Sequence, residues 1–163
     1  MMADLVQQIN KMLLIKLFYI IILYNYIMYN NIYNYFIVLV LFLVIDIPVI
    51  MKLNYNMYNK LFIRINNAEM NPDYLGAIMA YGLLALGLYL FVIKPHLDNE
   101  NENKNNIFIM GCIFGLVIYG IYNGTNLATI NNYGRYEAMI DTTWGTILCG
   151  IISALFIYLK KYI

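Results

Sequence analysis

Long apolar stretches alternate along this chain with shorter polar connectors. Four stretches are each about 20 residues long, which is the length a helix needs to cross the hydrocarbon core of a bilayer. They run from about Ile32 to Met51, Tyr74 to Ile93, Ile107 to Asn126, and Thr142 to Tyr162. The pattern predicts an all-α fold in which residues 32–163 form an integral membrane bundle of four transmembrane helices.

A fifth apolar stretch, from about Met12 to Met28, precedes these four. It contains Lys16 and Asn25, and the absence of an Ala-x-Ala motif after it argues against a cleaved signal peptide. It could be an additional span or an amphipathic helix in the membrane interface. We expect residues 1–31 to form a hydrophobic extension with a membrane-associated helix, continuous or nearly so with the first span. Five spans instead of four are the alternative.

The composition agrees with a chain embedded in lipid. Hydrophobic residues make up 63% and charged residues 12%, whereas a soluble domain is about half apolar and a quarter charged. The formal net charge is +1 and there is no basic patch, so nucleic-acid binding has no electrostatic footprint. We therefore expect a multi-pass protein whose partner is the lipid bilayer.

The connectors are polar and carry few chemically reactive groups. They run from Lys52 to Asp73, from Lys94 to Asn106 with the low-complexity run DNENENKNN, and from Leu127 to Asp141. The low-complexity run predicts a flexible link. The single histidine, His96, has no companion ligands, so we expect a solvated loop residue, no metal site and no cofactor. Cys112 and Cys149 lie in apolar stretches and are expected to be reduced, packed thiols, with a disulfide between neighbouring helices as the alternative.

Small residues recur at intervals of four in three of the spans. Without a hydrophobic driving force between helices in lipid, such residues let backbones approach closely. The stripes are Gly76 and Ala80; Gly111 and Gly115; Gly145, Cys149 and Ser153; and Thr146, Gly150 and Ala154. They predict close helix packing within one chain, with homo-oligomerisation through the same stripes as the alternative.

The polar residues of the spans fall near one face of the membrane. Successive spans are antiparallel, so the end of the first, the start of the second, the end of the third and the start of the fourth share a face. Tyr119 belongs to this layer, and we take as a candidate binding or structural cluster Asp46, Asn71, Tyr122, Asn123, Thr125, Asn126, Thr129, Asp141 and Trp144.

Asp46 is the most unusual member of this layer. It lies about five residues before the end of its span, roughly 7–8 Å deep at 1.5 Å per residue, where an unpaired charge is costly. Its partners could be Asn123, Asn126, Thr125, a tyrosine hydroxyl or Arg64. In one interpretation the cluster is an interhelical hydrogen-bond clamp; in the other it binds an ion, a polar head group or a substrate. Trp144 is most simply an interfacial anchor.

Several segments resemble a known family. FLVID, NPDYLGAIMAYGLLALGLYLFVIKP, GCIFGLVIYGIYNGTNLAT and IDTTWGTIL are similar to the small predicted membrane proteins catalogued as domain of unknown function 2177, over roughly Tyr33 to Ser153. The resemblance implies four spans and no established activity. It adds Tyr81 to the candidate cluster, and it implies an aspartate where this chain has Asn123.

Three function classes fit this pattern. A structural or scaffolding membrane protein of unassigned activity needs only the clamp. A small-molecule or ion carrier using Asp46 and Asp141 needs a water-accessible cluster. An intramembrane enzyme comes third, because the sequence has no His-rich, Ser-His or Cys-His arrangement and we name no catalytic residue. The substrate is not defined by the sequence.

The four-span topology predicts that the first and second connectors lie on opposite sides of the membrane. Single cysteines placed at Asn56 and Asn101, in a background lacking Cys112 and Cys149, should be labelled by an impermeant maleimide from opposite sides. Labelling of both from the same side would overturn the four-span arrangement.

Overall fold

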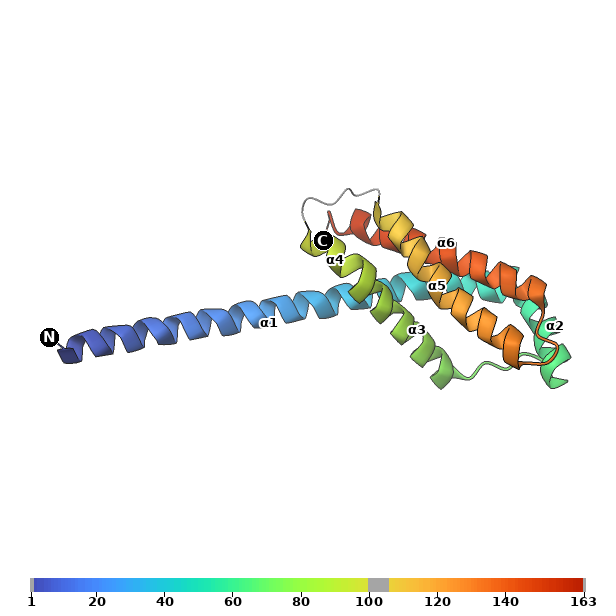
Figure 1. Cartoon of the computed structure of the whole chain (residues 1–163), viewed down its shortest axis with the longest axis horizontal. Coiled ribbons are helices and arrows are strands. Elements are labelled where there is room, and N and C mark those ends of the chain that lie inside the picture. Colours follow the sequence, from blue (N-terminus) through green and yellow to red (C-terminus); the bar gives the residue numbers. More distant parts are fainter. Residues whose placement is uncertain (1, 100–105, 163) are drawn as a thin grey trace. The chain divides into compact units, whose positions relative to one another are not determined.

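The computed structural model describes residues 2–99 and 106–162, and the described chain is helical with no strand (Figure 1). Its elements are α1 (Met2–Pro48), the π-helical turn η1 (Val49–Leu53), α2 (Tyr55–Asn66), α3 (Tyr74–Leu88), the π-helical turn η2 (Tyr89–Ile93), α4 (Lys94–Asp98), α5 (Asn106–Thr129) and α6 (Arg135–Leu159). The predicted all-α fold is confirmed. Residues 100–105, most of the low-complexity link, lie outside the described residues.

Among the described residues, four helical stretches are long and apolar enough to cross a membrane. They are Lys16–Lys52, Tyr74–Asp98, Asn106–Thr129 and Arg135–Leu159. Each contains one of the four predicted spans or most of it. The first has 37 residues, well beyond the roughly 20 that one crossing needs, so the choice between four and five spans stays a prediction.

The chain divides into two compact units, Met1–Phe36 and Ile37–Ile163. The described part of the first unit belongs to α1, which continues without a break to Pro48. The predicted continuity of the N-terminal segment with the first span is therefore confirmed. Leu17, Phe18, Ile20 and Ile21 are all exposed on it, and such all-round apolar exposure is typical of a lipid-facing helix.

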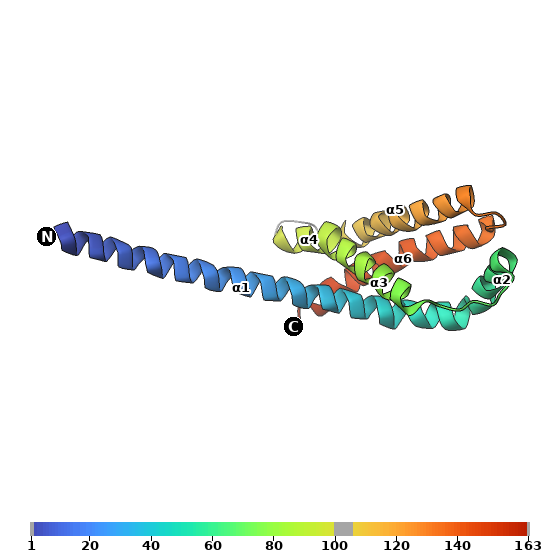
Figure 2. The same ribbon diagram turned by 90° about the horizontal axis from the view of Figure 1, so that it is seen from below.

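Helices α5 and α6 form an antiparallel pair in the second unit (Figures 1 and 2). A Cβ atom added to Gly115 would collide with the backbone oxygen of Gly145, and one added to Gly111 would lie 2.6 Å from the oxygen of Cys149. The stripes on α5 and α6 thus pack against each other, as predicted for close packing within one chain. The stripe on α3 is different, because a Cβ on Gly76 would meet only Asp73. Homo-oligomerisation stays a prediction.

The rest of the core comes from α1, α3 and the turn η2. Along α1, Val38, Phe42 and Asp46 are buried at intervals of four residues and so form one inward-facing stripe. The fully buried apolar side chains that complete the core are Ala85, Leu88, Ile93, Leu148, Cys149 and Ile152. Both cysteines are free thiols, as predicted.

The connectors contain more helix than the sequence pattern predicted. Residues 55–66 form α2, whose last turn ends at Asn67 in the left-handed conformation (φ 56°), which asparagine tolerates well. His96 lies in α4 and not in a loop, because Pro95 sits at the start of that helix, where its missing N–H is not needed. Helix α6 begins at Arg135, earlier than the predicted span.

The tight contact at Gly115 predicts a position-specific loss of stability. Gly115→Ala should lower the free energy of unfolding by about 1–3 kcal/mol, because the new methyl group meets the α6 backbone. Gly120→Ala on the same helix is the matched control, since a Cβ there meets nothing within 4 Å. Unfolding in mixed detergent micelles would measure both variants, and equal stabilities would contradict the contact.

Candidate functional site

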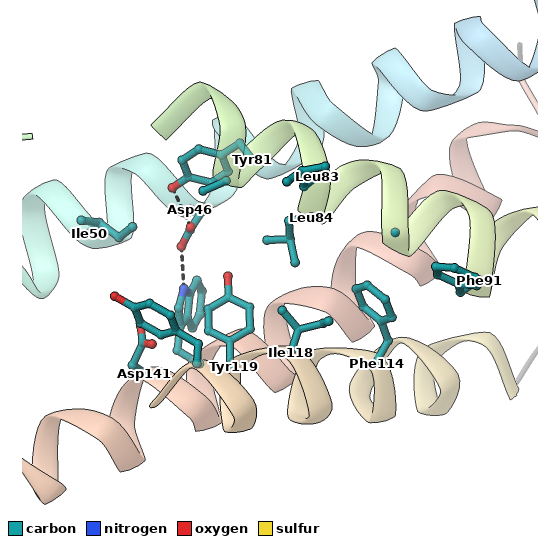
Figure 3. Close-up of a pocket in the computed structure, with 14 residues that line it drawn as sticks. Asp46, Ile50, Tyr81, Leu83, Leu84, Phe91, Phe114, Ile118, Tyr119 and Asp141 are labelled. Carbon is teal, nitrogen blue, oxygen red and sulfur yellow. Dashed lines mark hydrogen bonds between the residues drawn. The ribbon is translucent and has the colours of Figure 1, made fainter. Parts of the chain in front are cut away.

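Asp46 is a carboxylate held between three helices (Figure 3). Its side chain is only 3% exposed. The Tyr81 hydroxyl on α3 donates to Oδ2 (2.8 Å), and the Trp144 indole N–H on α6 donates to Oδ1 (2.7 Å). Each carboxylate oxygen therefore accepts a hydrogen bond from a different helix, which compensates part of the cost of burial. We call these three residues the Asp46 cluster.

A second carboxylate, Asp141 on α6, is held in a similar way. The Tyr58 hydroxyl on α2 donates to Oδ1 (2.6 Å), and the Asn123 amide on α5 donates to Oδ2 (2.7 Å). Asn123 is 2% exposed, and its own oxygen accepts from the Tyr133 hydroxyl in the α5–α6 loop (2.8 Å). These four residues form the Asp141 cluster, which joins α2, α5, α6 and the loop.

The two tyrosines outside the membrane-spanning segments remain protonated in this arrangement. Burial raises the pKa of the Tyr58 hydroxyl, and the neighbouring Asp141 carboxylate raises it further. Burial also raises the pKa of Tyr133, partly offset by a hydrogen bond with Asn126. Both hydroxyls are therefore donors at any physiological pH.

A cavity of about 630 Å³ lies between α3 and α5, with the two aspartates at one end (Figure 3). This α3–α5 cavity has a polar, aromatic end formed by Asp46, Tyr81, Tyr119, Tyr122, Asp141 and Trp144. Its other lining residues are all apolar: Ile50, which lies at the aspartate end in Figure 3, and Ala80, Leu83, Leu84, Gly87, Phe91, Phe114 and Ile118.

Tyr119 reaches this cavity because its neighbour on α6 is a glycine. A Cβ on Gly145 would collide with the Tyr119 ring, so only glycine lets the ring lie against α6. The hydroxyl points toward the Asp46 side of the cavity in Figure 3. Within residues 2–99 and 106–162, the structure gives this hydroxyl no hydrogen-bond partner.

The structure brings together about half of the predicted candidate residues. Asp46, Tyr81 and Trp144 form the first cluster, Asn123 and Asp141 belong to the second, and Tyr122 lines the cavity. The remaining candidates are not among the hydrogen-bond donors to either aspartate. Asn126 contacts Tyr133, the Thr129 hydroxyl donates to the Thr125 backbone oxygen, and Asn71 is exposed in the loop before α3.

The sequence interpretation did not identify Tyr58 and Tyr133 as partners of the cluster. Tyr58 lies on α2, and Leu61, three residues later on the same helix, is buried. This helical spacing within a polar connector was the signal from which an inward-facing Tyr58 could have been predicted. Arg64, named as one candidate partner of Asp46, pairs instead with Glu137 (2.8 Å). The described residues contain no group of three His, Cys, Asp or Glu side chains that could hold a metal ion.

A comparison with known protein families identifies the family of this chain. Residues 31–158, most of the chain, match the family described as predicted membrane protein (DUF2177), and the chain belongs to that family. It is thus a multi-pass membrane protein with no assigned activity, as the four apolar helices also indicate. No curated protein and no solved structure matches it.

Asn123, where the resemblance implies an aspartate, has a clear structural role in this chain. The Asn123 amide donates to Asp141 on one side and accepts from Tyr133 on the other. An ionised carboxylate could not donate, and at 2.7 Å from Asp141 it would have to share a proton with that residue. Asparagine therefore satisfies both neighbours without a titrating group.

The hydrogen bonds to Asp46 predict that two substitutions at this position differ in their effect on stability. Asp46→Leu should destabilise the protein by about 1–3 kcal/mol, because the Tyr81 hydroxyl and the Trp144 N–H both lose their acceptor. Asp46→Asn should be close to wild type, since the amide oxygen can accept from Trp144 while the amide nitrogen donates to Tyr81. Thermal unfolding in detergent measures both, and equal losses would contradict the hydrogen-bonding arrangement.

Proposed function

We propose that this membrane protein binds an amphipathic small molecule from the bilayer, in the α3–α5 cavity. The observation that supports this most strongly is the separation of the lining into a polar, aromatic end and an apolar remainder. The volume of about 630 Å³ lies within the usual range of pockets for organic ligands, roughly 300–1,000 Å³.

The orientation of the cavity matches that of a lipid in one leaflet. Tyr81 follows the first residue of α3 by seven positions, or about 10 Å, whereas Phe91 follows it by seventeen positions and lies in the turn η2 beyond the end of α3. On α5, Tyr122 precedes the last residue by seven positions and Phe114 by fifteen. A bound molecule would have its polar head near the membrane face and its apolar body deeper.

The rim of the cavity supports entry from the lipid phase. Leu83, Phe91, Ile118 and Tyr122 line the cavity and are also exposed on the helix surfaces. Because these side chains belong to membrane-spanning segments, the opening would face hydrocarbon. An apolar molecule dissolved in the bilayer could then enter without crossing water.

A structural or scaffolding role is the second candidate, and one observation favours it. All four carboxylate oxygens of Asp46 and Asp141 already accept hydrogen bonds within the protein. The clusters would then serve as clamps between helices. The two roles are compatible, since rigid clamps would also hold the polar end of a binding site in shape.

Filling the cavity separates the two candidates. Trp144 is the single tryptophan of the chain and lines the cavity, so its fluorescence reports occupancy. In nanodiscs of zwitterionic phosphatidylcholine, 1-dodecanol should change this emission saturably. Ala80→Phe should weaken the response at least about tenfold, because the ring occupies the space that the dodecyl chain needs.

Ala128→Phe is the matched control, because Ala128 is exposed on α5 and is absent from the cavity lining. It should bind 1-dodecanol as the wild type does. A response that does not saturate, or that is the same in Ala80→Phe, would leave the scaffold role as the better account.

A further inference from the structure

We infer that the α3–α5 cavity selects molecules with a cationic, alkylammonium head over those with neutral or anionic heads. This inference rests on the proposed function and specifies the chemical class of its ligand. It depends on three properties of the polar end: its charge, its unused hydrogen-bonding capacity and its aromatic rings.

The charge of the lining is entirely acidic. Asp46 and Asp141 are its two carboxylates, and it includes no lysine, arginine or histidine. The groups that donate to them are neutral phenol, indole and amide groups. Arg64, on the neighbouring helix α2, is paired with Glu137. An anionic head would therefore meet uncompensated like charges in a medium that screens them poorly.

The polar end also retains acceptors for a ligand's N–H groups. Each oxygen of the two carboxylates accepts from one donor among the described residues and, as a carboxylate oxygen, has a second lone-pair site. The Tyr119 hydroxyl points into the same region without a protein partner among the described residues (Figure 3). A primary ammonium has three N–H donors, which these acceptors could satisfy.

Aromatic rings surround this acidic end. Tyr81, Tyr119, Tyr122 and Trp144 all line the cavity beside the aspartates. The faces of such rings attract cations, with Trp and Tyr the strongest, and the attraction grows when the site is desolvated. Carboxylates together with aromatic rings favour an organic cation, whereas a bare divalent ion requires six or more oxygen ligands.

Probes that share a chain and differ only in the head test the selectivity. Wild type in phosphatidylcholine nanodiscs is titrated with dodecylamine, 1-dodecanol and dodecanoate, and Trp144 emission is followed against membrane-bound probe concentration. We expect dodecylamine to bind at least about tenfold more tightly than 1-dodecanol, and dodecanoate to bind most weakly. Empty nanodiscs supply the non-specific signal to be subtracted, and Ala80→Phe shows which part of the response depends on the cavity.

Two variants test the cause of the preference. The double variant Asp46→Asn, Asp141→Asn can keep every protein hydrogen bond, because each new amide nitrogen can face a tyrosine hydroxyl. It should lose the preference for dodecylamine and bind dodecylamine and 1-dodecanol with similar affinity. Tyr119→Phe should weaken dodecylamine binding several-fold without changing the melting temperature, since its hydroxyl has no partner within residues 2–99 and 106–162.

The outcomes distinguish this inference from the proposed function. Saturable binding that depends on Ala80 but ranks 1-dodecanol or dodecanoate first would overturn the cationic selectivity and keep the cavity as a binding site. An amine preference that persists in the double variant would also overturn it. Absence of saturable, Ala80-dependent binding by any of the three probes would overturn the proposed function itself.

Discussion

A carboxylate buried in a membrane protein must find donors inside the protein, and this constraint organises the structure around Asp46. Water is not available in the hydrocarbon region, and an unpaired charge there costs several kcal/mol. Tyr81 and Trp144 supply the two donors from two other helices. Within the second unit, these two hydrogen bonds therefore hold α1 against α3 and α6, together with the packing of apolar side chains.

Asp141 extends the same constraint to the rest of the bundle. Its donors come from α2 and α5, so the two aspartates together connect all the long helices with the short helix α2. Between α5 and α6, close packing acts together with hydrogen bonding, and Gly111, Gly115 and Gly145 let the two helices approach closely. Between α3 and α5, no comparable stripe closes the gap, and the cavity lies there.

The sequence predicted the parts of this arrangement that depend on composition along one helix. The spans follow from unbroken apolar length, close packing through small residues follows from glycine spacing, and the expectation that Asp46 and Asp141 lie near one face follows from alternating direction. The resemblance added Tyr81. These predictions need no knowledge of which helices are neighbours.

The parts that depend on neighbours could not be predicted in this way. Tyr58 is one of seventeen tyrosines in the chain, and only its place on α2 opposite Asp141 distinguishes it. Trp144 was expected at the interface, yet its N–H reaches a carboxylate on another helix. Asn71 is exposed in the loop before α3, and the Thr129 hydroxyl bonds to the backbone of its own helix, because predicted depth alone does not define which side chains meet.

The coupling between Asp46 and Trp144 tests the central claim most directly. A double-mutant cycle with Asp46→Ala and Trp144→Phe, measured as free energies of unfolding in the same detergent, isolates their interaction. The account predicts a coupling of about 1–3 kcal/mol, as expected for a buried hydrogen bond to a charged group. Additive effects, within about 0.5 kcal/mol, would contradict it.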